Sequence, residues 1–420
     1  MLLLVLERRL LWSVTNADRG TTSYYYNDAT TWAIAGAVLL VLIYFIVRAY
    51  LRARALRRPR RNRPRGSDRL LRRTIKAKRE LSRQYLRPGF SGTIHAIGIG
   101  RLSQGYCIHV FVTDAKQEWS IGGGATSLPA SYRGVPLVMI EMPVAEFSSE
   151  TQTATQEPIR LEGMRDRHEV ILGGLSGANT NLTNECGTIG YFCARKSRLP
   201  RRKEVHLLSN SHVFVDLSRA SVNESDLITQ PSPAETASNR PIASLVTFSP
   251  LKFANMDQPN HVDAAIAKLW SNSPHKFVIP LIGAVKGFVR KADVEPGEAA
   301  RKFGRTTGYT EGNIFSIHLD IWVRYDRAGQ SAFFQDQFLI APDLAGFTKF
   351  AAKGDSGSLV VDAQQHAIGL LFAGMSELPP VPEATTQLAE TEKAIQRVES
   401  YGVANPISEV LDRLKIELLI

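Results

Sequence analysis

The chain contains few cysteines: among 420 residues there are three, Cys107, Cys186 and Cys193. An odd number cannot all pair within one chain. Cys186 and Cys193 also flank one expected strand, whose extended backbone would hold them too far apart for a bridge. We therefore expect free, buried thiols and no disulfide framework. Metal-ligand patterns are missing too, because no Cys, His or carboxylate stands at ligand spacing from His95 or His109. Both are interpreted as core or surface histidines, and no metal or cofactor is expected.

Long uncharged runs are also scarce, and the informative one is residues 32–47, WAIAGAVLLVLIYFIV. Its 16 residues fall slightly short of the ~20 that span a bilayer, but two threonines extend it and Arg48 can snorkel. We predict a transmembrane helix over residues 30–51, preceded by an N-terminal segment, residues 1–29. The run starts late and is followed by arginines, which disfavours a cleaved signal peptide. A buried helix of a soluble domain is the alternative.

The formal net charge of +11 is concentrated in one segment. Residues 48–87 hold 17 Arg and Lys against two acidic residues, whereas residues 1–47 are balanced and residues 88–420 carry −4. Basic residues after a membrane span remain on the cytoplasmic side. We therefore expect a single-pass protein of the cell membrane with its large C-terminal part in the cytoplasm. Translocation of the basic flank would give the opposite, extracytoplasmic topology.

The basic juxtamembrane segment, residues 52–90, has two parts. Residues 57–66 (RRPRRNRPRG) combine arginine with two prolines and cannot form a regular helix, whereas residues 67–86 are predicted helical. Attraction to anionic lipid is the favoured interpretation, because the segment follows the membrane span. A role in fixing topology alone is the main alternative. Nucleic-acid binding is disfavoured, because no aromatic interleaving or known motif is present.

The remaining sequence predicts a mainly β protein. Residues 91–160 are expected to form a small α+β subdomain that ends in a polar linker. Residues 161–420 are expected to form one large domain that follows this linker. A C-terminal helix is predicted from four apolar residues at helical spacing: Ile407, Val410, Leu411 and Leu414.

The most informative motif is Gly354-Asp355-Ser356-Gly357-Ser358, which is followed by the apolar run Leu359-Val360-Val361. A serine between glycines in front of a buried strand is a typical setting for a nucleophile. The glycines allow a tight turn, so the backbone N–H groups of Gly354 and Ser356 can form an oxyanion hole. The pentapeptide also occurs in ordinary turns, so its meaning depends on partners upstream.

Suitable partners are present in the order His, Asp, Ser. His212 follows the strand-like residues 207–209, and Asp263 lies 51 residues later within an apolar stretch, 93 residues before Ser356. An imidazole is needed to take the serine proton, and a carboxylate is needed to orient the imidazole. Other carboxylates lie nearby at Asp216, Asp226 and Asp257, but none interrupts such an apolar segment. We predict His212, Asp263 and Ser356 as a catalytic triad.

Six blocks from residue 187 onward resemble trypsin/chymotrypsin-like serine peptidases. More closely, they resemble the subgroup typified by the plant NARROW LEAF proteins and related bacterial peptidases. The blocks are GTIG at 187–190, LSNSHV at 208–213, KFGRTTGYTEG at 302–312, GDSGSLVVD at 354–362, GLLFAG at 369–374 and ANPI at 404–407. The resemblance implies a chymotrypsin-like double β-barrel within residues 161–420, with barrels at about 170–270 and 281–375. It also implies the triad, but no particular substrate.

The same resemblance indicates a specificity pocket. In the wider family, the residue six before the nucleophile lies at the pocket base, which corresponds here to Phe350. The pocket wall would contain Phe372, Ala373 and Gly374. No charged residue is available to pair with Lys or Arg, so an apolar or small P1 side chain is expected. The alternative is that Phe350 only packs beneath the loop.

The sequence therefore predicts a membrane-anchored, regulated serine endopeptidase that acts on a cytoplasmic protein substrate and has a possible activating partner. One alternative is an extracytoplasmic quality-control protease. The other is a binding scaffold that keeps the fold without activity.

Overall fold

The computed structural model divides the chain into two units, Met1–Arg57 and Arg58–Ile420. The residues it describes are 11–16, 21–26, 67–86, 94–113, 119–121, 124–126, 129–147, 163–197, 203–219, 221–236, 239–325, 330–376 and 398–420. In the first unit, β1 (Leu11–Asn16) pairs antiparallel with β2 (Thr21–Tyr26). The predicted transmembrane helix, residues 30–51, lies outside the described residues. Within them, no helix is both long enough and apolar enough to cross a membrane.

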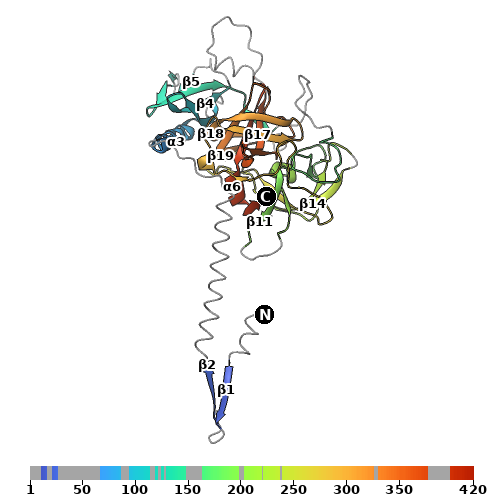
Figure 1. Ribbon diagram of the computed structural model, residues 1–420. Coiled ribbons are helices and arrows are strands. Elements are labelled where there is room, and N and C mark those ends of the chain that lie inside the picture. The colour runs from blue at the N-terminus through green and yellow to red at the C-terminus, as the bar shows by residue number, and fades with distance from the viewer. Residues whose placement is uncertain are drawn as a thin grey trace. The chain divides into compact units, whose positions relative to one another are not determined.

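The second unit is mainly β, as expected, and contains two large sheets (Figure 1). The first sheet has seven strands around a core that includes Ile189, Phe192 and Phe214. In β15 four of five residues are buried and only Lys268 is exposed, which fits a strand on the wall of a small barrel. In sheet order the strands are β10 (Ala178–Asn179), β13 (Leu227–Gln230), β14 (Arg240–Phe248), β15 (Ala265–Leu269), β12 (His206–Ser209), β11 (Tyr191–Arg195) and β23 (Ile416–Leu418).

The second sheet closes into a ring of six strands, because β17 pairs with both β18 and β20. A ring leaves no open edge inside the barrel. β18 and β19 form a long hairpin, and the pairing of β18 with β17 involves only Gly308–Asn313, the start of the strand. The ring order is β17 (Ala299–Gly304), β20 (Leu359–Val361), β21 (His366–Ser376), β22 (Ser400–Pro406), β19 (Gln330–Pro342) and β18 (Gly308–Tyr325).

The expected subdomain of residues 91–160 shares the second sheet instead of forming a sheet of its own. β3 pairs with β18 at Ile317, Asp320 and Ile321, and β4, β8 and β7 continue the sheet outward from β3. The apolar side chains of β3 and β4 are covered on one face by α3 (Ser67–Tyr85). The strands are β3 (Ile94–Leu102), β4 (Gly105–Val112), β7 (Ser131–Tyr132), β8 (Val135–Glu141) and the short β9 (Ala145–Phe147), with a separate pair β5 (Trp119–Ile121) and β6 (Gly124–Thr126).

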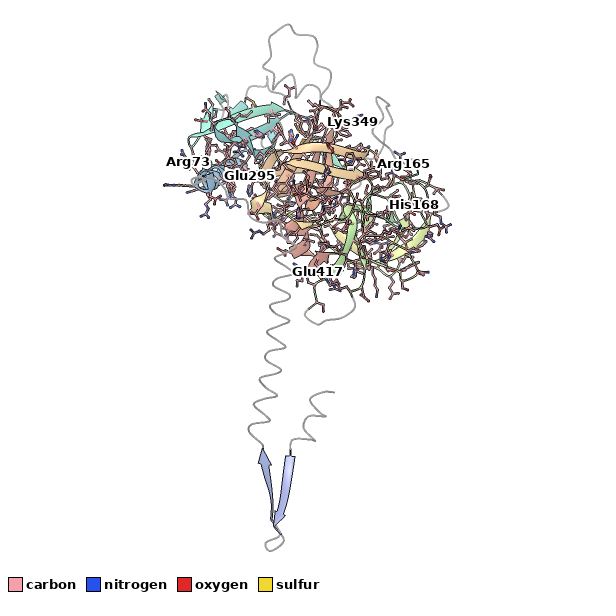
Figure 2. The ribbon with its side chains drawn as sticks, viewed as in Figure 1. Arg73, Arg165, His168, Glu295, Lys349 and Glu417 are labelled. Carbon is pink, nitrogen blue, oxygen red and sulfur yellow. The ribbon has the colours of Figure 1, made fainter. Side chains whose placement is uncertain are left out.

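The helix predicted over residues 67–86 is α3 (Ser67–Tyr85). Leu71, Ala77, Leu81 and Tyr85 are buried on one face, at the spacing of an amphipathic helix. The opposite face is basic and exposed, and it includes Arg73 (Figure 2), whose guanidinium donates to the Arg133 carbonyl at 2.7 Å. Lys78, on the buried face, is fully buried and pairs with Asp320 of β18 at 2.5 Å.

The C-terminal helix is α6 (Ile407–Arg413), and the four apolar residues that predicted it are all buried. After α6 the chain returns to the first sheet, where β23 pairs with β11. Among the described residues, no disulfide joins the three cysteines. Burial raises the pKa of the Cys107 thiol to about 11 and lowers the pKa of His95 and of His109 to about 4.

Candidate active site

His212 lies in a single helical turn, α4 (Ser211–Phe214), directly after the buried strand β12. The turn is fixed to the neighbouring strand, because the Ser211 hydroxyl donates to the carbonyl of Ala264 at 2.9 Å. The Asn210 side chain donates to the carbonyl of Asp263 at 2.7 Å. These bonds connect the two residues that precede His212 to the segment that carries Asp263.

The structure brings His212 and Asp263 together. The Nδ1 atom of His212 lies 2.5 Å from Oδ2 of Asp263, and both side chains are completely buried. Oδ1 of the same carboxylate accepts a bond from the backbone N–H of His212 at 3.3 Å. The carboxylate only accepts hydrogen bonds, so Nδ1 carries the proton and Nε2 is left to act as a base.

The other carboxylates near His212 in the sequence have different partners. Asp226 accepts from the side chain of Asn179 at 3.1 Å and from Arg219 at 3.3 Å. Asp216 accepts from the hydroxyl of Ser218 at 2.8 Å. These hydrogen bonds give both carboxylates a structural role in their own turns.

Ser356 lies on the loop between β19 and β20, where the flanking Gly354 and Gly357 have φ of +89° and +97°. These values favour glycine, because a side chain is strained there. The Ser356 hydroxyl donates to the carbonyl of Phe372 at 3.3 Å, and the Ser356 carbonyl accepts from the N–H of Thr188 at 2.8 Å.

The Ser356 loop packs against the end of the strand that precedes His212. A Cβ atom on Gly357 would overlap the Thr188 carbonyl and the Ser209 hydroxyl. Ser209, the last residue of β12, donates to the Thr188 carbonyl at 2.8 Å. The Ser356 loop thus lies beside the end of β12, three residues before His212.

The predicted oxyanion-hole donors are on the same loop. No acceptor in the described part of the chain is bonded to the backbone N–H of Gly354 or Ser356. Close contacts restrict the loop at this point, because a Cβ atom on Gly354 would lie 2.5 Å from the Thr306 hydroxyl. Both N–H groups therefore remain available to a developing negative charge.

Sequence reasoning missed one support of this loop, because it used residues 302–312 only as a block of the family resemblance. Asp355 is completely buried and pairs with the buried ammonium of Lys302 at 3.3 Å. The carboxylate also accepts from the backbone N–H groups of Thr306, Thr307 and Ala352. Burial by itself would raise the pKa of Asp355, but the Lys302 charge and these donors outweigh it and hold that pKa below its usual value.

The residues predicted for the specificity pocket are mostly core residues. Phe350 is completely buried, and its ring lies where a Cβ atom of Gly312 or Gly402 would be. Phe372 packs on Phe334 with ring centroids 4.6 Å apart. Ala373 is 5% exposed and belongs to the same cluster. The structure thus gives Phe350 the packing role that the sequence left as the alternative.

A second feature had no local signal in the sequence: the short strand β9 lies beside the predicted pocket wall. Glu146 of β9 pairs antiparallel with Gly374 of β21, and Gly374 pairs with Gly402 of β22 on its other side. β9 therefore occupies the β21 edge that continues from the Ser356 loop. Because the strands are antiparallel, β9 runs toward Phe372, whose carbonyl accepts from Ser356.

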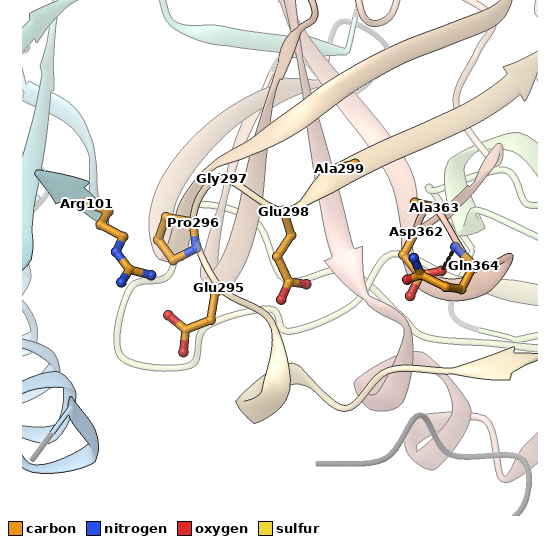
Figure 3. A pocket seen from close by; sticks show the side chains of 9 residues that line it. All are labelled: Arg101, Glu295, Pro296, Gly297, Glu298, Ala299, Asp362, Ala363 and Gln364. Atoms are coloured by element: carbon orange, nitrogen blue, oxygen red, sulfur yellow. Dashed lines mark hydrogen bonds between the residues drawn. The ribbon is translucent and has the colours of Figure 1, made fainter. Parts of the chain in front are cut away.

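A separate pocket of about 250 Å³ lies at the opposite end of β20 (Figure 3). Arg101 comes from β3, Glu295 and Glu298 precede β17, and Asp362 follows β20. None of the predicted triad or specificity residues lines this pocket, so it is distinct from the candidate active site.

Residues 273–380 match the model of peptidase family S64. This match contains Ser356 and Lys302 but neither His212 nor Asp263. No curated protein matches the chain.

Several solved structures of proteases are similar at low identity. Protease A of Thermobifida fusca has 15% identity and a TM-score of 0.36, covering 60% of this chain and 98% of its own. Nocardiopsis protease has 16% identity and a TM-score of 0.36, covering 60% and 99%. Cellulomonas bogoriensis chymotrypsin has 13% identity and a TM-score of 0.34, covering 59% and 98%. Structural similarity at this level supports no conclusion about the activity or the substrate of this chain.

The family match supports one enzyme class. The chain is a serine peptidase, a hydrolase whose substrate is protein. The narrower resemblance to the NARROW LEAF subgroup stays a prediction.

Proposed function

We propose that the chain is a serine endopeptidase whose triad is His212, Asp263 and Ser356. The buried His212–Asp263 contact at 2.5 Å beside the Ser356 loop is the observation that supports this most strongly. Nε2 of His212 takes the proton as the Ser356 hydroxyl attacks the peptide carbonyl. The imidazolium then gives that proton to the leaving amine, and water hydrolyses the acyl-enzyme by the same route.

Asp263 and the Ser356 loop have different roles in this mechanism. Asp263 fixes the tautomer of His212 and stabilises the imidazolium without itself taking the proton. The N–H groups of Gly354 and Ser356 bind the oxyanion of the tetrahedral intermediate. The buried Lys302–Asp355 pair holds the loop that presents both donors.

The test is labelling of the full-length protein with a fluorophosphonate probe, with Ser356→Ala as its matched control. We expect labelling of the parent protein and none of the variant. For a measurable substrate, Ser356→Ala should lower kcat by about 10⁶-fold and leave the residual rate that the oxyanion hole supplies. A parent protein that does not label, with the same melting temperature as the variant, would support the inactive binding scaffold instead.

We further propose that β9 regulates the enzyme. An extended peptide binds to a sheet edge through backbone hydrogen bonds, and β9 already forms such a pairing at Gly374. Peptide substrates then have to displace β9, whereas a small probe reaches Ser356 without using that edge. An activating partner that binds β9, or the segment around it, would open the edge to substrate.

Two variants of Glu146 distinguish blocking of the β21 edge by the β9 backbone from an effect of the Glu146 side chain. Proline has no N–H and weakens strand pairing, so Glu146→Pro should increase peptide hydrolysis while the rate of probe labelling stays unchanged. Glu146→Ala is the control, because it removes only the exposed ion pair with Arg324 and keeps the backbone pairing. Equal peptide hydrolysis by both variants and the parent protein would contradict regulation by β9.

For membrane attachment, we propose that residues 30–51 anchor the protein and leave the peptidase in the cytoplasm. The sequence distribution of charge supports this orientation, as does the exposed basic face of α3, formed by Arg69, Arg72, Arg73, Lys76, Arg79 and Arg83. Reporters fused to each end should place the C-terminus inside, and the protein should stay in the membrane fraction in carbonate. A C-terminal reporter found outside would favour the extracytoplasmic alternative.

The P1 preference of the proposed enzyme is for an apolar or small side chain. The support is that Phe372, Ala373 and Gly374 next to Ser356 carry no charge. A peptide library that varies P1 tests this, and cleavage chiefly after Arg would overturn it.

A further inference from the structure

The β18–β19 hairpin of the second sheet reaches the carboxylate of the proposed triad. Tyr325, the last residue of β18, donates from its hydroxyl to Oδ2 of Asp263 at 2.9 Å. The same oxygen accepts from Nδ1 of His212. A carboxylate can only accept, so the phenol must supply the proton of this bond.

The tyrosine ring is held rigidly in place. It is completely buried and lies 5.7 Å from the ring of Phe253, 6.3 Å from Phe334 and 5.9 Å from His212, measured between centroids. Burial, followed by the adjacent Asp263 charge, raises the pKa of Tyr325 well above its usual value. The hydroxyl therefore stays protonated at every pH at which such an enzyme works.

The hairpin also contacts the segment before Asp263. Phe253 forms a β-bridge with Ala332, and the N–H of Asn260 donates to the carbonyl of Phe333 at 2.9 Å. Both partners belong to β19. The second sheet thus holds the backbone of the Asp263 segment as well as its side chain.

We propose that Tyr325 is a positioning residue for the triad, which acts by fixing the carboxylate of Asp263. This inference rests on the proposed function. Tyr325 and the backbone N–H of His212 hold opposite oxygens of the carboxylate, so the carboxyl plane cannot rotate and Oδ2 stays directed at Nδ1. Phe372, whose carbonyl accepts from Ser356, has no side-chain donor to take over this role.

The test compares Tyr325→Phe with Tyr191→Phe in the full-length protein. Tyr325→Phe keeps the ring contacts and removes the hydroxyl. Tyr191→Phe removes another buried hydroxyl, which donates to the Phe277 carbonyl at 2.8 Å in the first sheet. Loss of a hydrogen bond to a charged group should lower the maximal rate of fluorophosphonate labelling by about ten- to a hundredfold in Tyr325→Phe. The half-saturating probe concentration should not change, and Tyr191→Phe should label like the parent protein.

A second experiment, in the Asp263→Ala variant, distinguishes a positioning role of Tyr325 from a general effect of its substitution on stability. If Tyr325 acts through Asp263, adding Tyr325→Phe to Asp263→Ala should cause no further loss of labelling rate. A similar loss in both backgrounds, or full-rate labelling of Tyr325→Phe, would overturn the inference and leave the proposed function intact. If the parent protein itself does not label at Ser356, the proposed function fails and this inference fails with it.

Discussion

Replacing Lys302 by methionine should destabilise the protein strongly, because it leaves the Asp355 carboxylate buried without a counter-charge. Both side chains are completely buried, with their charged atoms 3.3 Å apart. At an effective dielectric constant of about 20, two unit charges at that distance attract by about 5 kcal/mol. The ammonium also donates to the Gly308 carbonyl at 3.2 Å and to the Thr307 hydroxyl, and both would lose that donor. We expect Lys302→Met to lower the free energy of unfolding by about 3 to 5 kcal/mol.

Urea unfolding followed by tryptophan fluorescence measures this loss, and a double variant provides the control. Removing both charges in Lys302→Met with Asp355→Asn should recover part of the stability, because no uncompensated charge remains buried. The pKa of folded Asp355 lies below its usual value, so ionisation of this carboxylate contributes stability above about pH 4, and that contribution is lost as the pH falls further. The reasoning is refuted if Lys302→Met stays within about 1 kcal/mol of the parent protein, or if the double variant is less stable than Lys302→Met.

Two further substitutions test the core and the nucleophile loop. Burial disfavours the charged form of His109 and lowers its pKa to about 4. Between about pH 6.5 and pH 4 the unfolded chain therefore binds more protons at this residue than the folded chain, so the free energy of unfolding decreases as the pH is lowered through that range. His109→Phe should therefore reduce the loss of stability between pH 7 and pH 5 by about 2 kcal/mol, and an unchanged difference between the two urea midpoints would contradict this. Gly357→Ala should cost more than about 2 kcal/mol and abolish probe labelling, because φ is +97° and the new Cβ would overlap the Thr188 carbonyl. Normal labelling by this variant would show that the loop is more adaptable than its contacts indicate.

Each residue of the predicted triad has a local signal in the sequence. Ser356 stands between two glycines that need positive φ, and His212 follows the end of a buried strand. Asp263 is a carboxylate within an apolar stretch, where a partner is required. The mainly β class was predictable for the same reason, since strand alternation and turn glycines act over a few residues.

The supports of the site could not be predicted, because they depend on contacts between distant segments. Tyr325 is separated from Asp263 by 62 positions in the sequence. It lies in a strand where apolar and polar residues alternate, so the sequence does not distinguish it from any other buried tyrosine. Lys302 lies in a strand where a lysine is normally interpreted as exposed, and only the fold shows it buried against Asp355. β9 is three residues long, too short for a period-2 pattern to identify its partner.

The position of β18 limits how the substrate edge could open. β18 pairs with β9 at Val323–Tyr325, binds α3 through Asp320 and places the Tyr325 hydroxyl on Asp263. β9 also pairs with β21 at Gly374. If the edge opened by movement of the β18–β19 hairpin, Tyr325 would leave Asp263 and the triad would lose its orientation. Release of β9 alone breaks three strand pairs with β18 and one with β21, and it leaves the Tyr325 bond in place. An activator can therefore open the peptide-binding edge without disturbing the triad only if it binds the released β9 more tightly than the paired one.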